Sequence, residues 1–189
     1  IEAVSKVLVP GNISYVKWDM NRHLTDLGSA YLDRKNQNEL SHRYVLGLYQ
    51  VMETLTERFP QVLFESCSSG GGRFDAGMLY YMPQTWTSDN TDAVCRLKIQ
   101  HGTSFLFPTV TMGAHVSACP NHQVGRTTPL ATRFAVAAAG NLGYELDLKK
   151  LLKEEKKEVR EQIAEYKRRR RTVQFGTYYR LADSFQENQ

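Results

Sequence analysis

Two aspartates with surroundings suited to nucleophilic and acid–base chemistry stand out in this sequence, and the first is Asp19. It ends the segment 13–19, whose β-branched and aromatic residues predict a short buried strand. Side chains alternate along a strand, so Lys17 and Asp19 share one face, where the ammonium stabilises the ionised carboxylate. An ionised, shielded carboxylate is what a carboxylate nucleophile requires. The alternative is a Lys–Asp ion pair that only closes the strand.

The second aspartate, Asp89, follows another expected strand at 84–87. Two carboxylates facing one cavity are the minimal apparatus for glycoside cleavage, in which one attacks the sugar and the other protonates the leaving oxygen. The acid must hold its proton until then, and Trp86 is the expected source of apolar surroundings. Trp18 and Trp86 are also candidates to stack on sugar faces. The alternative for this region is that Asp89 or Asn90 caps the helix that follows.

A cysteine and a run of glycines follow a further expected strand at 61–64. The consecutive glycines from Gly70 to Gly72 let the backbone turn tightly or approach a ligand closely. A phosphate loop would need the Lys-Ser/Thr pair or the spacing of the dinucleotide fingerprint, and this run has neither. We interpret Cys67 as a small lining residue, because a nucleophilic thiol needs a partner and His115 is only a distant candidate.

The expected elements alternate strands with helices, which predicts an α/β protein with a parallel sheet. Chemically able residues gather where strands end, a placement typical of a (β/α)8 TIM barrel, of which about four to five βα units would be present. A doubly wound open sheet is the competing fold. Segments 1–12 and 22–37 are expected to be loops, and 177–181 resembles a strand. The expected helices are 38–59, 92–102, 128–139 and 148–171, and the expected strands are 13–19, 61–64, 84–87, 108–116 and 141–146.

The composition indicates a folded domain, since 41% of the 189 residues are hydrophobic and 11% are aromatic. The net charge of +4 owes much to the run 167–171, which ends an expected helix without the interleaved aromatic residues of a nucleic-acid site. The three cysteines match no metal spacing, so we expect free thiols, a cytoplasmic location and no metal or cofactor. No signal peptide or membrane-spanning run is found, and the start at Ile1 suggests an excised piece of a longer protein.

Several long motifs, in one order along the chain, resemble the family-36 glycoside hydrolases, the bacterial α-galactosidases. The resemblance covers essentially the whole chain and is far more specific than the pair of carboxylates. The motifs are Lys17-Trp18-Asp19-Met20-Asn21-Arg22, Cys67-Ser68-Ser69-Gly70-Gly71-Gly72-Arg73-Phe74-Asp75, Trp86-Thr87-Ser88-Asp89-Asn90-Thr91-Asp92-Ala93, Pro120-Asn121-His122-Gln123 and Gly143-Tyr144-Glu145-Leu146-Asp147.

The resemblance implies a retaining α-galactosidase that hydrolyses terminal α-galactosyl residues from oligosaccharides of the melibiose and raffinose type. In that family the positions that match Asp19 and Asp89 are the nucleophile and the acid/base, and those that match Lys17 and Asn21 bind galactose hydroxyls. The positions implied to line the subsite of the cleaved sugar are Cys67, Gly70 and Trp86.

The same resemblance places residues 1–175 in the C-terminal part of the catalytic barrel and 176–189 at the start of a linker or C-terminal β domain. It implies a galacto-oligosaccharide substrate and a homo-oligomer, a tetramer in full-length relatives, with neither nucleic acid nor membrane as partner. The absent strands would carry further galactose-binding residues, so the isolated chain is expected to be a poor catalyst. Two other functions stay open, namely galactosyl transfer to another sugar and a sugar- or phosphate-binding module without turnover.

Overall fold

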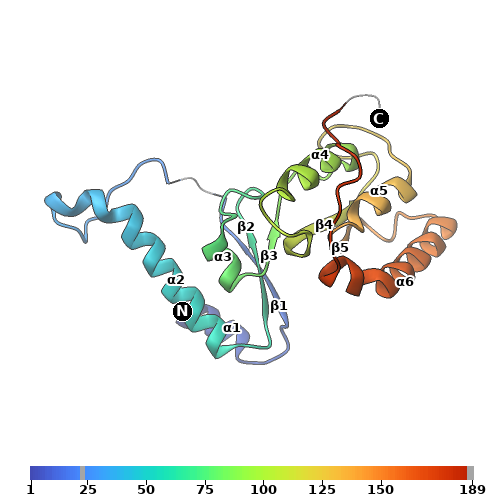
Figure 1. The fold of residues 1–189 in the computed structure, drawn as a ribbon. Coiled ribbons are helices and arrows are strands. Elements are labelled where there is room, and N and C mark those ends of the chain that lie inside the picture. Colours follow the sequence, from blue (N-terminus) through green and yellow to red (C-terminus); the bar gives the residue numbers. More distant parts are fainter. Residues whose placement is uncertain (22–23, 187–189) are drawn as a thin grey trace. The chain divides into compact units, whose positions relative to one another are not determined.

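The computed structural model describes residues 1–21 and 24–186, and the chain divides into two compact units, Ile1–Pro83 and Gln84–Gln189 (Figure 1). In both units parallel strands alternate with helices, as in successive βα units. Each unit buries a hydrophobic core of its own. No helix in the described part of the chain combines the length and the apolar character needed to cross a bilayer.

The first unit pairs two parallel strands, β1 (Tyr15–Asp19) and β2 (Leu63–Cys67). In their register Lys17 lies beside Glu65 and Asp19 beside Cys67, so the last residues of two neighbouring strands meet at one edge of the pair. The helical elements of this unit are α1 (Glu2–Leu8), the 3-10 helix η1 (Arg34–Glu39), α2 (Leu40–Arg58) and α3 (Ala76–Tyr81).

One face of β1 is turned toward the core that the helices cover. Val16 and Trp18 pack on this core, which includes Met52 of α2, and Figure 1 shows α1 lying beside α2. Val16 and Trp18 are half-buried, so each contributes less to folding than the about 1.5–3 kcal/mol of a fully buried side chain, and their packing fixes the orientation of the strand. Because side chains alternate along β1, Lys17 and Asp19 lie on its other face, as predicted.

The second unit contains three parallel strands in the order β3 (Gln84–Trp86), β4 (Met112–Ser117) and β5 (Asn141–Glu145). Val116 of β4 is fully buried against α5 and α6. Gly143 of β5 lies beside His115, and a Cβ at that position would come within 2.5 Å of the imidazole, so a larger residue would displace the ring. The helical elements are α4 (Ala93–Thr103), the 3-10 helix η2 (Thr109–Thr111), α5 (Leu130–Ala137) and α6 (Lys153–Phe175).

Two expectations near the ends of the chain are wrong. Much of segment 1–12 forms α1, because Val4 and Leu8 lie one helical turn apart and both pack on the first core. Residues 177–181 form no strand, and there the Arg180 guanidinium donates to the Ser104 hydroxyl at 3.0 Å. An alternating segment forms a strand only where a neighbouring strand offers hydrogen bonds and packing, which this one does not find in the described residues.

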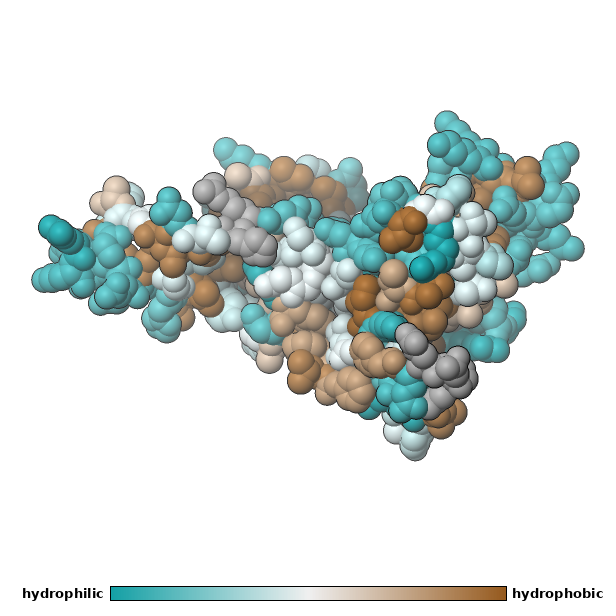
Figure 2. All heavy atoms as spheres, turned by 90° about the horizontal axis from the view of Figure 1, so that it is seen from above, coloured by the Kyte–Doolittle hydropathy of each residue, from teal (hydrophilic) through white to brown (hydrophobic). Residues whose placement is uncertain are grey.

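Other boundaries differ by a few residues. Helix α6 begins at Lys153 and not at the expected residue 148, and Leu148 and Leu152 before it are 56% and 67% exposed. The short helix α3 has no counterpart among the expected elements, and the Asp75 side chain caps it. Apolar side chains also reach the surface, which mixes hydrophobic with hydrophilic residues on the face seen in Figure 2, as is usual for proteins. The motif residue Arg22 lies outside the described residues.

Candidate active site

Asp19 stands exposed at the end of β1, and a neighbouring amide holds its carboxylate. The Asn21 Nδ2 atom donates to Asp19 Oδ2 at 3.1 Å. The other end of the same amide accepts a hydrogen bond from the Ser69 backbone N–H at 2.7 Å. Asn21 therefore ties the carboxylate to the turn that follows β2, which fixes the direction in which the carboxylate points.

The glycine run forms a tight turn immediately after β2. Ser69 and Gly70 both have positive φ angles, 49° and 89°, and Ser68 N donates to Gly70 O at 2.9 Å. The Ser68 hydroxyl also donates to the Met20 carbonyl at 2.7 Å, so the turn is fastened to the chain just beyond Asp19. Glycine suits the second of these positions because its backbone adopts positive φ without steric cost.

Cys67 lies next to Asp19 at the end of β2 and is buried, with 3% of its surface exposed. Burial raises the pKa of the Cys67 thiol, and its hydrogen bond to the Asp19 carboxylate raises it further. The thiol therefore stays protonated at neutral pH and donates its proton toward Asp19. A protonated, buried thiol supports the interpretation as a lining residue and argues against a nucleophilic cysteine.

The raised pKa of Cys67 predicts slow alkylation. With iodoacetamide at pH 8, the exposed Cys119 should react within minutes, whereas Cys67 should remain mostly unmodified over the same time, because alkylation requires the thiolate. Peptide mass mapping after a time course would measure both rates in one sample. Equal rates for Cys67 and Cys119 would contradict the environment described for Cys67.

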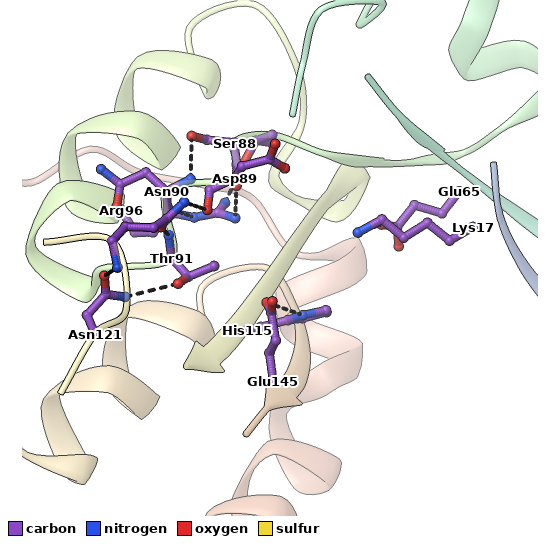
Figure 3. A network of polar contacts seen from close by, with 12 residues as sticks. Lys17, Glu65, Ser88, Asp89, Asn90, Thr91, Arg96, His115, Asn121 and Glu145 are labelled. Carbon is purple, nitrogen blue, oxygen red and sulfur yellow. Dashed lines mark hydrogen bonds and ion pairs between the residues drawn. The ribbon is translucent and has the colours of Figure 1, made fainter. Parts of the chain in front are cut away.

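Lys17 forms an ion pair with Glu65, a residue outside the site predicted from the sequence. The Lys17 Nζ atom lies 3.7 Å from Glu65 Oε1, the Tyr15 hydroxyl donates to the same carboxylate, and Figure 3 shows the Lys17 and Glu65 side chains lying side by side. The Glu65 side chain is 1% exposed and that of Lys17 is 39% exposed. A buried carboxylate, that of Glu65, thus holds the lysine that shares a face of β1 with Asp19.

Trp18 does not share a face with these polar residues. Its ring packs beside Met52, Phe64 and Met82 in the first core, opposite Lys17 on β1. The predicted contact of Trp18 with substrate therefore conflicts with its position, because alternation along β1 directs this side chain into the core. We assign it a packing role.

The second aspartate, Asp89, lies exposed in the turn between β3 and α4. It does not cap α4: the N-cap is Asp92, whose side chain accepts from Cys95 N at 2.9 Å. Asn90 bonds within the turn, where its Oδ1 accepts from Asp92 N at 3.1 Å. The capping alternative for Asp89 is therefore wrong, and its carboxylate is left for another task.

Trp86 is buried at the end of β3, between two charged or titratable groups. Its ring centroid lies 4.5 Å from that of His115, and the Arg96 guanidinium carbon lies 4.3 Å from the ring centre. His115 Nδ1 is in turn 3.5 Å from Glu145 Oε2 (Figure 3). The packing gives Trp86 a structural role, and its contact with sugar stays a prediction.

In residues 1–21 and 24–186, no group of three or more His, Cys, Asp or Glu side chains is placed to hold a metal ion. The arrangement offers instead two exposed carboxylates at strand ends, one held by an amide and a thiol and the other carried by a tightly bonded turn. Carboxylates suit proton transfer and attack on an electrophilic carbon.

The sequence profile of the family described as Melibiase matches residues 1–176. The chain belongs to the Melibiase family. The alpha-galactosidase AgaA of Geobacillus stearothermophilus is 63% identical over 189 residues, and alpha-galactosidase 1 of Pediococcus pentosaceus is 54% identical over 188 residues. Both alignments cover 100% of this chain and 26% of the relative. The crystal structure of the GH36 alpha-galactosidase AgaA superposes with a TM-score of 0.96 and covers 99% of this chain and 26% of that chain.

This Melibiase chain thus spans about a quarter of the length of the curated relatives that it matches. The agreement with GH36 enzymes confirms the predicted fold class, a partial (β/α)8 barrel, and excludes the doubly wound alternative. Five strands, each followed by a helix, make up the described part, in line with the expected four to five βα units.

Proposed function

We propose that the protein to which this chain belongs is a retaining α-galactosidase that hydrolyses terminal α-galactosyl residues of oligosaccharides of the melibiose and raffinose type. Asp19 is the nucleophile and Asp89 is the acid/base. Relatives that align with the whole chain are named alpha-galactosidases, which supports the activity.

One observation carries the assignment of the two aspartates. The AgaA enzyme was crystallised with raffinose in a variant with an Asp→Asn substitution and with stachyose in a variant with an Asp→Ala substitution, both also carrying one Ala→Glu substitution. The two substituted aspartates are separated by the same number of positions as Asp19 and Asp89. Such substitutions suit the trapping of uncleaved substrate on an enzyme that lacks one catalytic carboxylate.

The proposed reaction has two steps. In the first, an Asp19 oxygen bonds to the anomeric carbon while the bond from that carbon to the leaving oxygen breaks, and Asp89 gives its proton to the leaving oxygen. In the second, Asp89 takes a proton from water, whose oxygen displaces Asp19 and releases galactose with its original configuration. The hydrogen bonds from Asn21 and Cys67 orient the Asp19 carboxylate for the attack.

On the first unit, galactose binds to the polar face of β1 that carries Lys17 and Asp19. Lys17 is partly exposed there and offers an ammonium donor to a galactose hydroxyl, and Asn21 offers an amide. Cys67 lies next to the nucleophile, and Gly70 lies in the turn that follows Cys67. These four residues form the proposed subsite for the cleaved galactose, and the rest of the parent protein supplies the remaining contacts.

A panel of nitrophenyl glycosides tests the proposed function on the full-length parent. We expect rapid release of nitrophenol from the α-galactoside and little from α-glucoside, α-mannoside or β-galactoside. Proton NMR during the first minutes should show α-galactose before the anomers equilibrate, since double displacement retains configuration. Initial release of β-galactose would contradict the retaining assignment, and hydrolysis of none of the glycosides would contradict the activity.

The Lys17–Glu65 pair predicts a change in substrate binding. In the parent, Glu65→Gln should raise KM by about 10-fold and lower kcat less, because Lys17 loses the charge that holds it. Glu39→Gln is the matched control, since it removes the partner of Arg43 from an exposed pair on η1 and α2 and should leave both constants unchanged. Unchanged KM in Glu65→Gln would show that the pair does not position Lys17 for substrate.

We further propose that the parent is a cytoplasmic homo-oligomer in which residues 176–189 lead into a C-terminal β domain. The three cysteines, Cys67, Cys95 and Cys119, are all free thiols, which suits a reducing compartment. Analytical ultracentrifugation of the parent would measure the oligomeric state.

A further inference from the structure

The turn that carries Asp89 is held by two side chains from outside it. Three consecutive carbonyl groups, those of residues 88, 89 and 90, each accept a hydrogen bond from one of these side chains. Arg96 Nη2 donates to Ser88 O at 2.6 Å and Arg96 Nε donates to Asn90 O at 2.9 Å. Gln123 Nε2 donates to the Asp89 carbonyl, and Gln123 Oε1 accepts from Thr91 N at 2.8 Å.

Arg96 donates its hydrogen bonds to the turn from the buried side. It lies in the first part of α4, is 3% exposed, and also donates to the Thr87 hydroxyl. Figure 3 shows Arg96 beside Ser88 and Asn90. Desolvation lowers the pKa of Arg96 to about 10, so the guanidinium is still charged at neutral pH. Its planar fork spans two carbonyls that a single donor could not reach together, which suits a residue that sets backbone geometry.

Gln123 contacts the turn from the exposed side, and hydrogen bonds within its own loop hold Gln123 in place. Asn121 is buried, and its Oδ1 accepts from Gln123 N at 3.0 Å and from Val124 N at 3.1 Å. The Asn121 amide also donates to the Thr91 hydroxyl at 3.0 Å. The two loops are thus joined at Asp89 and at Thr91, while the Asp89 side chain remains exposed.

We propose that Arg96 and Gln123 are positioning residues for the acid/base, and that they hold the backbone of the Asp89 turn so that its carboxyl group reaches the leaving oxygen. This inference rests on the proposed function. Proton transfer needs a heavy-atom distance of about 2.6–3.2 Å, and a displacement of about 1 Å can cost 100-fold in rate. Asp19 is not part of this turn, so its attack on the sugar should be unaffected when Arg96 or Gln123 is replaced. The loss of rate should then come from slower protonation of the leaving group.

The test uses Gln123→Ala in the full-length parent, with raffinose and dinitrophenyl α-galactoside as substrates. We expect kcat/KM to fall by about 10-fold or more on raffinose, whose leaving oxygen needs the acid, and by less than about 3-fold on the aryl galactoside, whose leaving group does not. Val124→Ala changes the neighbouring exposed side chain and should leave both values unchanged. Arg96→Lys keeps the charge but loses the fork, and should show the same selective loss as Gln123→Ala.

The outcomes separate this inference from the proposed function. If the unmodified parent cleaves neither substrate, the proposed function fails. If the parent is active and Gln123→Ala lowers both substrates equally or leaves raffinose unaffected, the positioning role is wrong. Thermal unfolding of Gln123→Ala should stay close to that of the parent because water can replace the amide at this exposed site, so a selective loss of activity cannot be assigned to unfolding.

Discussion

Replacement of Asp19 by glycine in the full-length parent should lower kcat on α-galactosides by about 10,000-fold, because no carboxylate remains to attack the anomeric carbon. Sodium azide should restore part of the activity, since the missing side chain leaves room for a small anion beside Asn21 and Cys67. Azide enters from the face that Asp19 occupied while Asp89 still protonates the leaving oxygen, so the product should be β-galactosyl azide.

Asp19→Asn is the matched control for this rescue. The amide is as large as the carboxylate, so activity should be lost as in Asp19→Gly but azide should not restore it. Steady-state assays with and without azide, together with NMR of the product, measure both effects. Near-normal activity in Asp19→Gly, or equal rescue of the glycine and asparagine variants, would contradict the role given to Asp19.

Replacement of Asp89 by alanine should lower kcat/KM far more on substrates with poor leaving groups than on substrates with good ones. On raffinose we expect kcat/KM to fall by about 100- to 10,000-fold, the usual worth of general acid catalysis, whereas dinitrophenyl α-galactoside should lose little in the first step. Hydrolysis of the glycosyl-enzyme formed from this substrate should then be slow, because no base activates water. Azide should react with the glycosyl-enzyme faster and give α-galactosyl azide, the anomer opposite to that from Asp19→Gly.

Asp92→Ala is the control for Asp89→Ala, because Asp92 lies in the same segment as Asp89 but has a structural role. It caps α4 and pairs with Arg126. Loss of a cap costs about 0.5–2 kcal/mol of stability, which thermal unfolding would report. A leaving-group dependence as steep in Asp92→Ala as in Asp89→Ala would show that the effect comes from disturbance of the segment and not from a missing acid.

The fold class and the polar face of β1 could be predicted from the sequence because they depend on local patterns. Alternation of apolar and polar residues from Tyr15 to Asp19 places Lys17 and Asp19 on one face, and the structure confirms this placement. The same alternation also directs Trp18 into the core, and a preference for aromatic residues near sugars outweighed it in the prediction.

The partners of the site residues could not be predicted in the same way, because they depend on register and on loops distant in sequence. Glu65 lies beside Lys17 only because β1 and β2 pair in a particular register. Gln123 reaches the Asp89 turn from 34 residues further along the chain. Helix α1 was missed for a different reason: residues 1–12 were expected to form one loop, although the turn at Pro10-Gly11 follows a helix that ends at Leu8.

The most direct test of the central claim is to trap the glycosyl-enzyme intermediate on the full-length parent. A fluorinated α-galactosyl fluoride should react once and then turn over slowly, because the added fluorine destabilises the oxocarbenium-like transition state of the second step. Mass spectrometry of a protease digest should place the fluorogalactosyl group on the peptide that contains Asp19, and Asp19→Gly should acquire no label. A label on Asp89 or on another carboxylate, or no covalent adduct on an active enzyme, would contradict the account.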